Sequence, residues 1–279
     1  MTARSSPPQP ITQNLQNWQS WHERATAYHQ LIASWPIFSC LADRLIDLVP
    51  QPFHGTAIDL AAGSGLVTER LLSRYPHSHV QLVEPAAAML ALARKQLGTR
   101  VASYTQLPAE EVGTLTTRAD VVLCSAALHL LDEAKVFTGL ARCLPLGGLF
   151  VCNLWWHSWE PTVGPDYTSV WQPLVEQALA DLNEPRGTWP QPLPPRVRTE
   201  ASIRAAAHAA KLSLETIITD TDTIPNRFFI DFAAMSATFL SHLSVSQRAR
   251  VIARAGERAN TPVQVQTTRF VFRRETHSI

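Results

Sequence analysis

Hydrophobic and polar positions follow two alternating periods along this chain, and the alternation predicts a regular succession of strands and helices. Short apolar runs predict strands at 56–60, 80–84, 101–105, 120–125 and 147–154. Stretches with a helical period lie between them, at 65–74, 86–97 and 133–144. Strands and helices that alternate in this way form βαβ units, and right-handed crossovers wind these into a doubly wound, mainly parallel sheet. We therefore expect an α/β fold with a Rossmann-like core over residues 51–154.

The segments before this core predict a tail and a helical cap. Residues 1–13 are polar and rich in proline, and they lack the apolar stretch of a signal peptide, so we expect a flexible tail. Residues 14–48 carry a helical period that is interrupted near Pro36. A helical cap is expected over residues 14–50.

The regular pattern breaks after Leu154. Five of the eight tryptophans and eight of the twenty prolines fall within residues 155–195, with no clean period. Such a segment is too apolar for a disordered linker, and its aromatic side chains can supply a large packing area. We expect a helical or irregular lid insertion over residues 155–198.

Residues 199–279 are predicted to complete the core sheet. A helix is expected at 199–211, with Thr199 as its N-cap and Ser202 as the alternative. Alternating patterns at 214–224 and 263–273 predict two strands, and helices are expected between them at 228–241 and 246–259. This order indicates a hairpin-like edge on the parallel sheet, with an antiparallel C-terminal strand at the edge.

Composition and charge narrow the functional classes. Apolar residues make up 46% of the chain and charged residues 17%, as in ordinary globular proteins. The net charge of +1 gives no field that would recruit nucleic acid or an anionic membrane, and no apolar run is long enough to span a bilayer. The four cysteines lack metal-type spacing, and the two in strand-like runs are expected to be buried free thiols. These features predict a cytoplasmic protein without a metal site, a nucleic-acid partner or a membrane partner; they do not indicate an oligomeric state.

A run of arginines near the C-terminus is the one basic feature that could contradict this. It consists of Arg248, Arg250, Arg254 and Arg258 on a predicted helix. A solvated helix face is favoured over a nucleic-acid surface.

The most informative motif is a glycine turn followed by an acid. Residues 57–65 read Ala-Ile-Asp-Leu-Ala-Ala-Gly-Ser-Gly, and Glu84 follows nineteen residues after the last glycine, at the end of the next predicted strand. A strand, tight turn, helix, strand and acid in this order are typical of a site for a nucleoside cofactor. A nicotinamide dinucleotide is disfavoured, because Thr68 occupies the place of the third glycine and Asp59 precedes the turn.

On these residues the chain resembles the class I S-adenosylmethionine-dependent methyltransferases, in particular those that act on small molecules. Five motifs match in order, at 59–65, 84–85, 108–111, 119–129 and 144–148. Residues 21–28 also resemble the helix that closes over the cofactor in many members. The end of the fourth strand reads Ser-Ala-Ala-Leu, unlike the Asn-Pro-Pro-Tyr motif of nucleic-acid methyltransferases.

The resemblance implies S-adenosyl-L-methionine as cofactor and assigns residues to its parts. Asp59, with the backbone of Ala61 and Gly63, would lie beside the methionine moiety, and Glu84 would bind the ribose hydroxyls. The remaining residues expected to contact the cofactor are Tyr28, Pro85, Met89, Pro108, Ala109, Glu110, Ser125 and Ala126.

Two positions depart from the family pattern. Ala61 replaces a glycine. The methyl group of alanine is tolerated at this position if the backbone φ stays negative. Pro108 stands where many members carry an aspartate that accepts a hydrogen bond from the adenine amino group. Adenine would then depend on backbone groups near residues 107–110 and on apolar packing.

The expected reaction is in-line methyl transfer to a small, aromatic or apolar acceptor through oxygen, nitrogen or carbon. Methyl transfer requires positioning and desolvation, together with a base where the acceptor is a hydroxyl. His129 is the candidate base, although its segment resembles one found in members that use no base. The residues expected to line the acceptor site are Tyr28, His129, Trp155, Trp156 and His157, where the tryptophans could equally form a hydrophobic plug. A non-methylating rearrangement or cyclisation with the same cofactor, and a catalytically silent partner protein, are the two alternatives.

Overall fold

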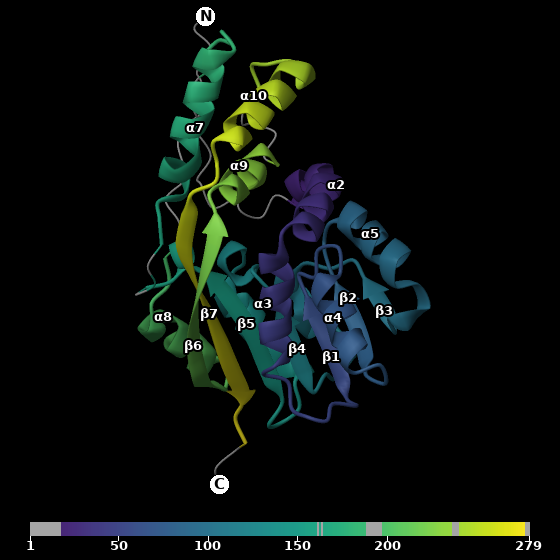
Figure 1. The fold of residues 1–279 in the computed structure, drawn as a ribbon. Helices are drawn as coiled ribbons and strands as arrows, with labels where there is room; N and C mark the ends of the chain where they lie inside the picture. The colour runs from purple at the N-terminus through teal and green to yellow at the C-terminus, as the bar shows by residue number, and fades with distance from the viewer. Residues whose placement is uncertain (1–17, 161, 163, 188–196, 236–239, 277–279) are drawn as a thin grey trace, which may run out of the picture.

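The computed structural model describes residues 18–160, 162, 164–187, 197–235 and 240–276, with side chains from Trp21 onwards (Figure 1). Four predictions fall outside these ranges in whole or in part. The expected tail at 1–13 lies wholly outside, and so do residues 14–17 of the first expected helix and residues 236–239 of the helix expected at 228–241. So do residues 188–196 of the expected lid.

A seven-stranded sheet forms the centre of the molecule, in the order β3-β2-β1-β4-β5-β7-β6. The strands are β1 (Thr56–Leu60), β2 (His79–Val83), β3 (Ser103–Thr105), β4 (Val121–Cys124), β5 (Leu149–Trp155), β6 (Leu212–Pro225) and β7 (Pro262–Arg274). Strands β1 to β5 pair in parallel, and β7 pairs antiparallel with both β5 and β6. The doubly wound, mainly parallel sheet with an antiparallel C-terminal strand is confirmed.

The expectation that the C-terminal strand lies at the edge is wrong. β7 lies between β5 and β6, so β6 is the edge strand. Six successive residues of β7, from Thr267 to Phe272, are buried, whereas β6 alternates between partly buried and exposed positions from Ile218 to Thr223. The polar alternation of β6, with its threonines and aspartates, suits a strand that has solvent on one side.

Helices cover both faces of the sheet. The elements are α2 (Trp18–Ser34), α3 (Pro36–Ile46), α4 (Leu66–Arg74), α5 (Ala87–Leu97), α6 (Glu133–Cys143) and α8 (Glu200–Ala209), with short 3-10 turns η1 (Gly98–Arg100), η2 (Ala109–Thr114), η3 (Leu128–Leu130) and η4 (Trp156–Ser158). α3, α4 and α5 pack against one face, and α6 and α8 pack against the other. Thr199 caps α8 in a reciprocal pair with Ser202, so both predicted capping residues take part. The predicted break near Pro36 is confirmed, because Pro36 opens α3.

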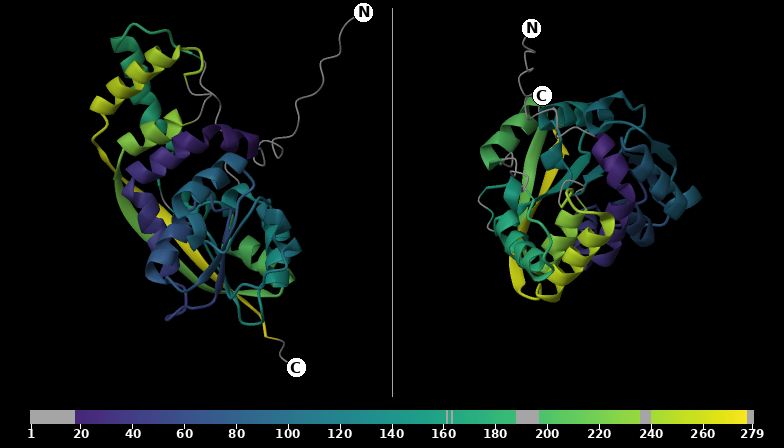
Figure 2. Two further views of the ribbon diagram at one scale, coloured as in Figure 1. Left: turned by 90° about the vertical axis from the view of Figure 1, so that its right-hand side faces the viewer. Right: turned by 90° about the horizontal axis from the view of Figure 1, so that it is seen from above.

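The remaining helices form a lobe beyond the sheet. α7 (Tyr167–Asp181), α9 (Arg227–Ala234) and α10 (Val245–Glu257) pack together above the upper ends of β6 and β7 (Figure 1), and Figure 2 shows the same lobe from the side. The regular 15-residue α7 lies in the segment for which the sequence showed no clean period. Its buried residues, Trp171, Val175, Ala178 and Leu179, follow a helical spacing that Pro173 obscures.

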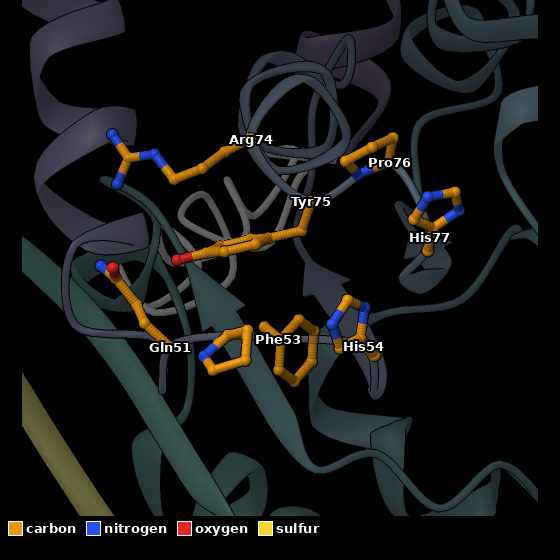
Figure 3. Close-up of a pocket in the computed structure, with 8 residues that line it drawn as sticks. Gln51, Phe53, His54, Arg74, Tyr75, Pro76 and His77 are labelled. Atoms are coloured by element: carbon orange, nitrogen blue, oxygen red, sulfur yellow. The ribbon is translucent and has the colours of Figure 1, made fainter.

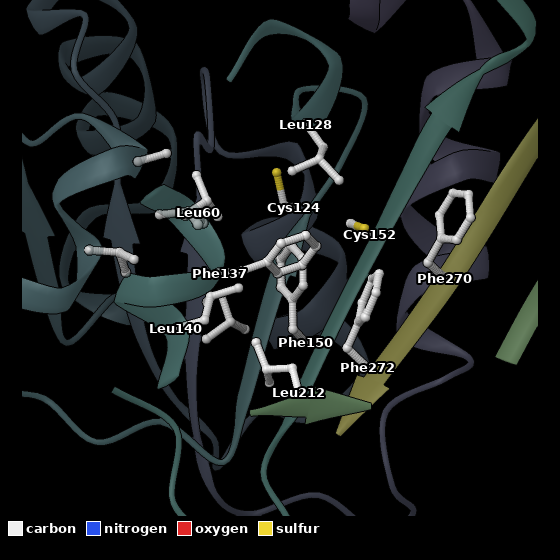
Figure 4. Packing of buried hydrophobic residues seen from close by; sticks show 14 of the residues in the cluster. Leu60, Cys124, Leu128, Phe137, Leu140, Phe150, Cys152, Leu212, Phe270 and Phe272 are labelled. Atoms are coloured by element: carbon white, nitrogen blue, oxygen red, sulfur yellow. The ribbon is translucent and has the colours of Figure 1, made fainter. Parts of the chain in front are cut away.

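Aromatic side chains fill the core beneath β4 and β5. Phe137, Phe150 and Phe272 lie within 6 Å of one another by ring centroids, and Figure 4 shows Cys124 and Cys152 beside them. These two cysteines are buried free thiols, as predicted, and so is Cys143, whereas Cys40 is exposed. This packing holds the carboxyl ends of β4 and β5 in place, where the loop after β4 begins.

Candidate functional site

The turn after β1 has the backbone geometry that its glycines permit. Gly63 has a φ of +56° and Gly65 a φ of +90°. A methyl group on Gly65 would lie 2.8 Å from the Leu97 side chain, so glycine is required there for space as well as for conformation. Ala61 also has a positive φ, of +55°. The condition under which alanine is tolerated at this position, a negative φ, is not met, because this turn needs a left-handed residue where the family commonly has glycine.

Glu84 connects this turn to the end of β2. The backbone N–H of Gly63 donates to Glu84 Oε2 at 2.8 Å, and the N–H of Ala86 donates to Oε1 at 2.9 Å. The residue is 6% exposed, and burial raises the pKa of its carboxyl to about 7, although the two backbone hydrogen bonds oppose the rise. The carboxylate is therefore held in a fixed orientation at the carboxyl ends of two neighbouring strands.

Asp59 makes its hydrogen bonds within the fold, at the start of α4. Its Oδ2 accepts hydrogen bonds from the Thr68 N–H at 3.0 Å and from the Thr68 hydroxyl at 2.7 Å. Asp59 is 1% exposed, and burial raises its pKa to about 6 against the opposing effect of the Thr68 bonds. Because the carboxylate faces the first turn of α4, it fixes that helix to β1 and does not line the cavity described next. Thr68, which stands where dinucleotide folds carry a third glycine, supplies the hydroxyl for this contact.

A cavity lies at the carboxyl ends of β1, β2 and β4, where parallel α/β sheets bind ligands. Ten of the twelve residues predicted to contact the cofactor line it, namely Tyr28, Ala61, Gly63, Glu84, Pro85, Met89, Ala109, Glu110, Ser125 and Ala126. Asp59 and Pro108 do not. Trp21, Ala127, Leu130 and Leu131 also line the cavity and were missed. Trp21 precedes Tyr28 by seven residues, or two helical turns, and this spacing could have identified it.

The roof of the cavity comes from α2. The rings of Trp21 and Tyr28 meet edge to face with centroids 5.4 Å apart. Burial, together with the nearby Glu84, raises the pKa of the Tyr28 hydroxyl to about 12, so it stays protonated. The charged side chains that line the cavity are the carboxylates of Glu84 and Glu110. A ligand that presents hydroxyl or amino donors and a positive charge fits this lining.

The floor of the cavity depends on a residue that sequence reasoning missed. Ala126 has a left-handed φ of +51°, and its N–H donates to Asn153 Oδ1 at 2.5 Å. Asn153 is 1% exposed and lies in β5, whose seven residues are all buried. A lone amide in such an apolar strand was the available signal, because buried polar groups normally have a specific partner.

The expected acceptor residues lie outside the cavity lining, with the exception of Tyr28. The rings of His129 and His157 meet edge to face, 5.5 Å apart, and within the described chain neither Nδ1 has a hydrogen-bond partner. Burial is the main cause that lowers the pKa of His129 to about 3 and that of His157 to about 4. A base with so low a pKa has little affinity for a proton at neutral pH, and this geometry does not support His129 as the base.

Trp155 and Trp156 belong to the packing between the sheet and the lobe. Both are 7% exposed, and the ring of Trp155 contacts Phe38 and Phe228. Of the two roles weighed for these tryptophans, their burial favours the hydrophobic plug. Tyr28 and Ala126 contact the same cluster from the cavity side, so they separate the cavity from the plug.

Three of the four arginines in the basic run are paired with acids, and Arg248 donates to the carbonyl of Leu243. Arg250 pairs with Glu184, Arg254 with Asp181 and Glu257, and Arg258 with Asp181. Two of these pairs are made to Asp181, the last residue of α7. The ion pairs explain these arginines as contacts of a helix face.

A second hollow lies at the opposite end of the sheet (Figure 3). Its lining comes from the loops before β1 and β2 and includes Phe53, His54, Tyr75 and His77. Arg74 at its rim pairs with Asp47. No residue predicted for the site lies there, and the amino ends of parallel strands are not where this fold binds cofactors.

Among the residues that the structure describes, no group of three or more histidines, cysteines or acids is arranged to hold a metal ion. None of the described helices combines the length and the apolar character needed to cross a membrane.

The central part of the chain is similar to known methyltransferases. Residues 57–148 match a family model described as a methyltransferase domain. Trans-aconitate 2-methyltransferase of Acidovorax sp. (strain JS42) is 32% identical over 106 residues, which are 38% of this chain and 39% of that protein. The chain thus matches about two fifths of the length of this curated relative.

Solved structures show the same fold over nearly the whole chain. The [4+2]-cyclase SpnF is 13% identical, with a TM-score of 0.60 over 98% of this chain and 100% of its own. A geranyl diphosphate methyltransferase in complex with S-adenosylmethionine is 16% identical, with a TM-score of 0.51 over 88% of this chain and 89% of its own. Together with the glycine turn and the acid that ends β2, the family match shows that residues 57–148 form a methyltransferase domain of the class I S-adenosylmethionine-dependent family, and the solved structures show its fold.

Proposed function

We propose that this protein transfers a methyl group from S-adenosylmethionine to a small-molecule acceptor. The observation that carries the proposal is the Glu84 carboxylate, held by Gly63 and Ala86 inside the cavity beneath Trp21 and Tyr28. The donor carries its methyl group on a sulfonium, whose sulfur is an activated leaving group. The protein therefore has to position the acceptor and to exclude water.

The residues of the cavity fit the parts of this donor. Glu84 would accept hydrogen bonds from the ribose hydroxyls, as carboxylates do in nucleoside sites of this fold. Met89 and Ala109 would pack on the adenine. Glu110 lines the cavity two residues after Pro108, so its carboxylate offers an acceptor that Pro108 lacks. Since Asp59 is bonded to Thr68, the ammonium of the methionine moiety would use carbonyl groups of the turn at Ala61.

The acceptor would lie beside the loop after β4, whose residues 125–127 and 130–131 line the cavity. Among the described residues of the lining there is no histidine, lysine or cysteine. An acceptor atom that is already nucleophilic at neutral pH, such as a carboxylate, an unprotonated amine or an electron-rich carbon, needs no base for the displacement. The aromatic surroundings favour an apolar or aromatic molecule. The relative from Acidovorax is named for a small carboxylic acid, which is one acceptor of the kind that needs no base.

A binding titration tests the donor half of this proposal. Calorimetry with S-adenosylmethionine and with S-adenosylhomocysteine should give saturable binding at one site. Absence of binding to both would rule out any enzyme that uses this cofactor and would favour the catalytically silent alternative.

Labelled cofactor separates the two enzymatic readings. With methyl-labelled S-adenosylmethionine and a pool of small metabolites, methyl transfer moves the label into a new product. The lack of a histidine, lysine or cysteine among the described lining residues is equally compatible with a rearrangement or cyclisation on the same fold, in which the label stays on the cofactor. Retention of the label together with a changed metabolite would favour this alternative.

A further inference from the structure

Helix α2 carries an aromatic–histidine pair twice, as Trp21-His22 and Tyr28-His29. The two pairs are seven residues apart, which is close to two helical turns, so equivalent members lie on the same face. Trp21 and Tyr28 line the cofactor cavity. The histidine of each pair makes a hydrogen bond to one of the two turns that form that cavity.

The first histidine contacts the start of α5. The backbone N–H of Ala88, the second residue of α5, donates to His22 Nδ1 at 3.2 Å. An N–H in the first turn of a helix has no partner within the helix, so the imidazole satisfies a group that would otherwise need water. Because the N–H is the donor, Nδ1 of His22 is the unprotonated nitrogen.

The second histidine contacts the glycine turn. His29 Nδ1 and the Ser64 hydroxyl share a hydrogen bond of 3.0 Å. Ser64 is 1% exposed and lies between Gly63 and Gly65. A methyl group added to Gly63 would lie 3.7 Å from the Tyr28 ring, so the ring covers this turn closely. The two histidines thus connect one helix to the turn after β1 and to the helix after β2.

We propose that His22 and His29 are positioning residues that hold α2 as the roof of the cofactor cavity and thereby set how slowly the cofactor leaves. This inference rests on the proposed function for its ligand. The buried centre of the contact between α2 and α5 consists of Ala25, Ala86 and Met89, and partly buried side chains of both helices pack against it. The two hydrogen bonds add directional contacts to this packing and connect α2 to both sides of the cavity.

The test compares variants that remove or keep the polar atom. Asparagine carries a polar atom near the position of Nδ1, so His22→Asn and His29→Asn can retain the contacts, whereas His22→Leu and His29→Leu cannot. Gln30→Leu is the matched control, an exposed residue of the same helix. Release of S-adenosylhomocysteine is measured by stopped-flow fluorescence, alongside the melting temperature.

Each leucine variant should speed release by about 2- to 10-fold, and the double variant by about 10-fold or more, since that range corresponds to one net hydrogen bond per site. The asparagine variants and Gln30→Leu should stay within about 2-fold of wild type. Unchanged release from the double leucine variant would overturn the proposal.

Hydrogen exchange of the ligand-free protein supplies a readout that needs no cofactor. In the double leucine variant, amides of α2 should exchange faster, while those of α6, on the other side of the sheet, should not change. Unchanged protection of α2 would overturn the positioning role. The two proposals can fail separately. If wild-type protein binds no S-adenosylhomocysteine but α2 exchanges faster in the double leucine variant, the proposed function is refuted and the role of the histidines stands.

Discussion

The backbone N–H of Gly63 donates a 2.8 Å hydrogen bond to Glu84 Oε2, so the turn after β1 is fastened to the acid that ends β2. The other carboxylate oxygen is held by Ala86. β1 and β2 are neighbouring parallel strands, and their carboxyl ends meet at one edge of the sheet. The orientation of Glu84 is thus fixed before any ligand arrives, which lowers the entropic cost of binding.

Glu84→Ala should weaken binding of S-adenosylhomocysteine by more than about 10-fold. The variant removes two charge-assisted acceptors of the ribose and leaves two backbone N–H groups without a partner. Glu84→Gln should also weaken binding, because its NH₂ group would face one of those N–H donors. Glu111→Gln, at an exposed neighbouring acid, is the control. Calorimetric affinity within about 2-fold of wild type for Glu84→Ala would show that the ribose lies elsewhere.

Cofactor affinity should fall as the pH decreases below about 7. Burial raises the pKa of Glu84 to about 7 in the ligand-free protein, and only the ionised carboxylate can accept from both ribose hydroxyls. A ligand that requires the ionised form loses up to about 10-fold in affinity per pH unit below that pKa and is insensitive above it. Calorimetry over roughly three pH units around that pKa, from about 5.5 to about 8.5, should show this bend. The bend should be absent in Glu84→Gln, and its persistence there would assign the titration to another group.

Ala61→Gly should stabilise the protein. Ala61 has a φ of +55°, and a left-handed conformation costs a non-glycine residue roughly 1 kcal/mol that glycine avoids. The melting temperature should rise by about 2–4 °C. Ala62→Gly is the matched control, since Ala62 is not among the residues with positive φ and should gain no stability. Equal or lower stability of Ala61→Gly would show that the alanine methyl contributes packing that outweighs its strain.

Much of the fold could be predicted because its signals are local. The apolar run at 56–60 coincides with β1, and Pro36 marks the start of α3, as the period of the side chains and the chemistry of proline require. The order of β6 and β7 could not be predicted, since it depends on which strand buries both faces against distant elements. α7 was not predicted, because Pro173 lies inside it and proline normally indicates the end of a helix.

The contacts of the site also divide into those that the sequence predicts and those that it does not. Glu84 and Gly63 meet because parallel strands end at one edge, which strand pattern and motif spacing together predict. The pairing of Asp59 with Thr68 depends on the rotation of α4 against β1, which the sequence does not specify. The contact between Asn153 and Ala126 joins β5 to the loop after β4 through one side chain, and no motif marks it.

The pair formed by His129 and His157 should make the protein sensitive to acid. The pKa of each is lowered in the fold, to about 3 and about 4, so the unfolded chain takes up protons that the folded one refuses. Their contribution to stability is therefore fully present above the ordinary histidine pKa of about 6.5 and is lost as the pH falls towards 4. His157→Phe should lower the pH at which circular dichroism reports unfolding. His208→Gln, at an exposed position on α8, should leave that pH unchanged. An unchanged acid midpoint in His157→Phe would show that other groups control acid unfolding.

Asn153→Ala should be destabilising, in contrast to Thr267→Val, a substitution of another buried polar residue. Asn153 Oδ1 accepts from the Ala126 N–H, so alanine leaves a backbone donor without its partner, at a cost of about 1–3 kcal/mol, and releases the left-handed turn at the cavity floor. Thr267 is 1% exposed, and within the described chain its hydroxyl has no partner. Valine has nearly the same shape and removes an unsatisfied group, so this variant should be neutral or more stable. Chemical denaturation measures both changes, and cofactor affinity should fall only for Asn153→Ala. Equal stability of the two variants would mean that the bond to Ala126 contributes nothing to holding the floor.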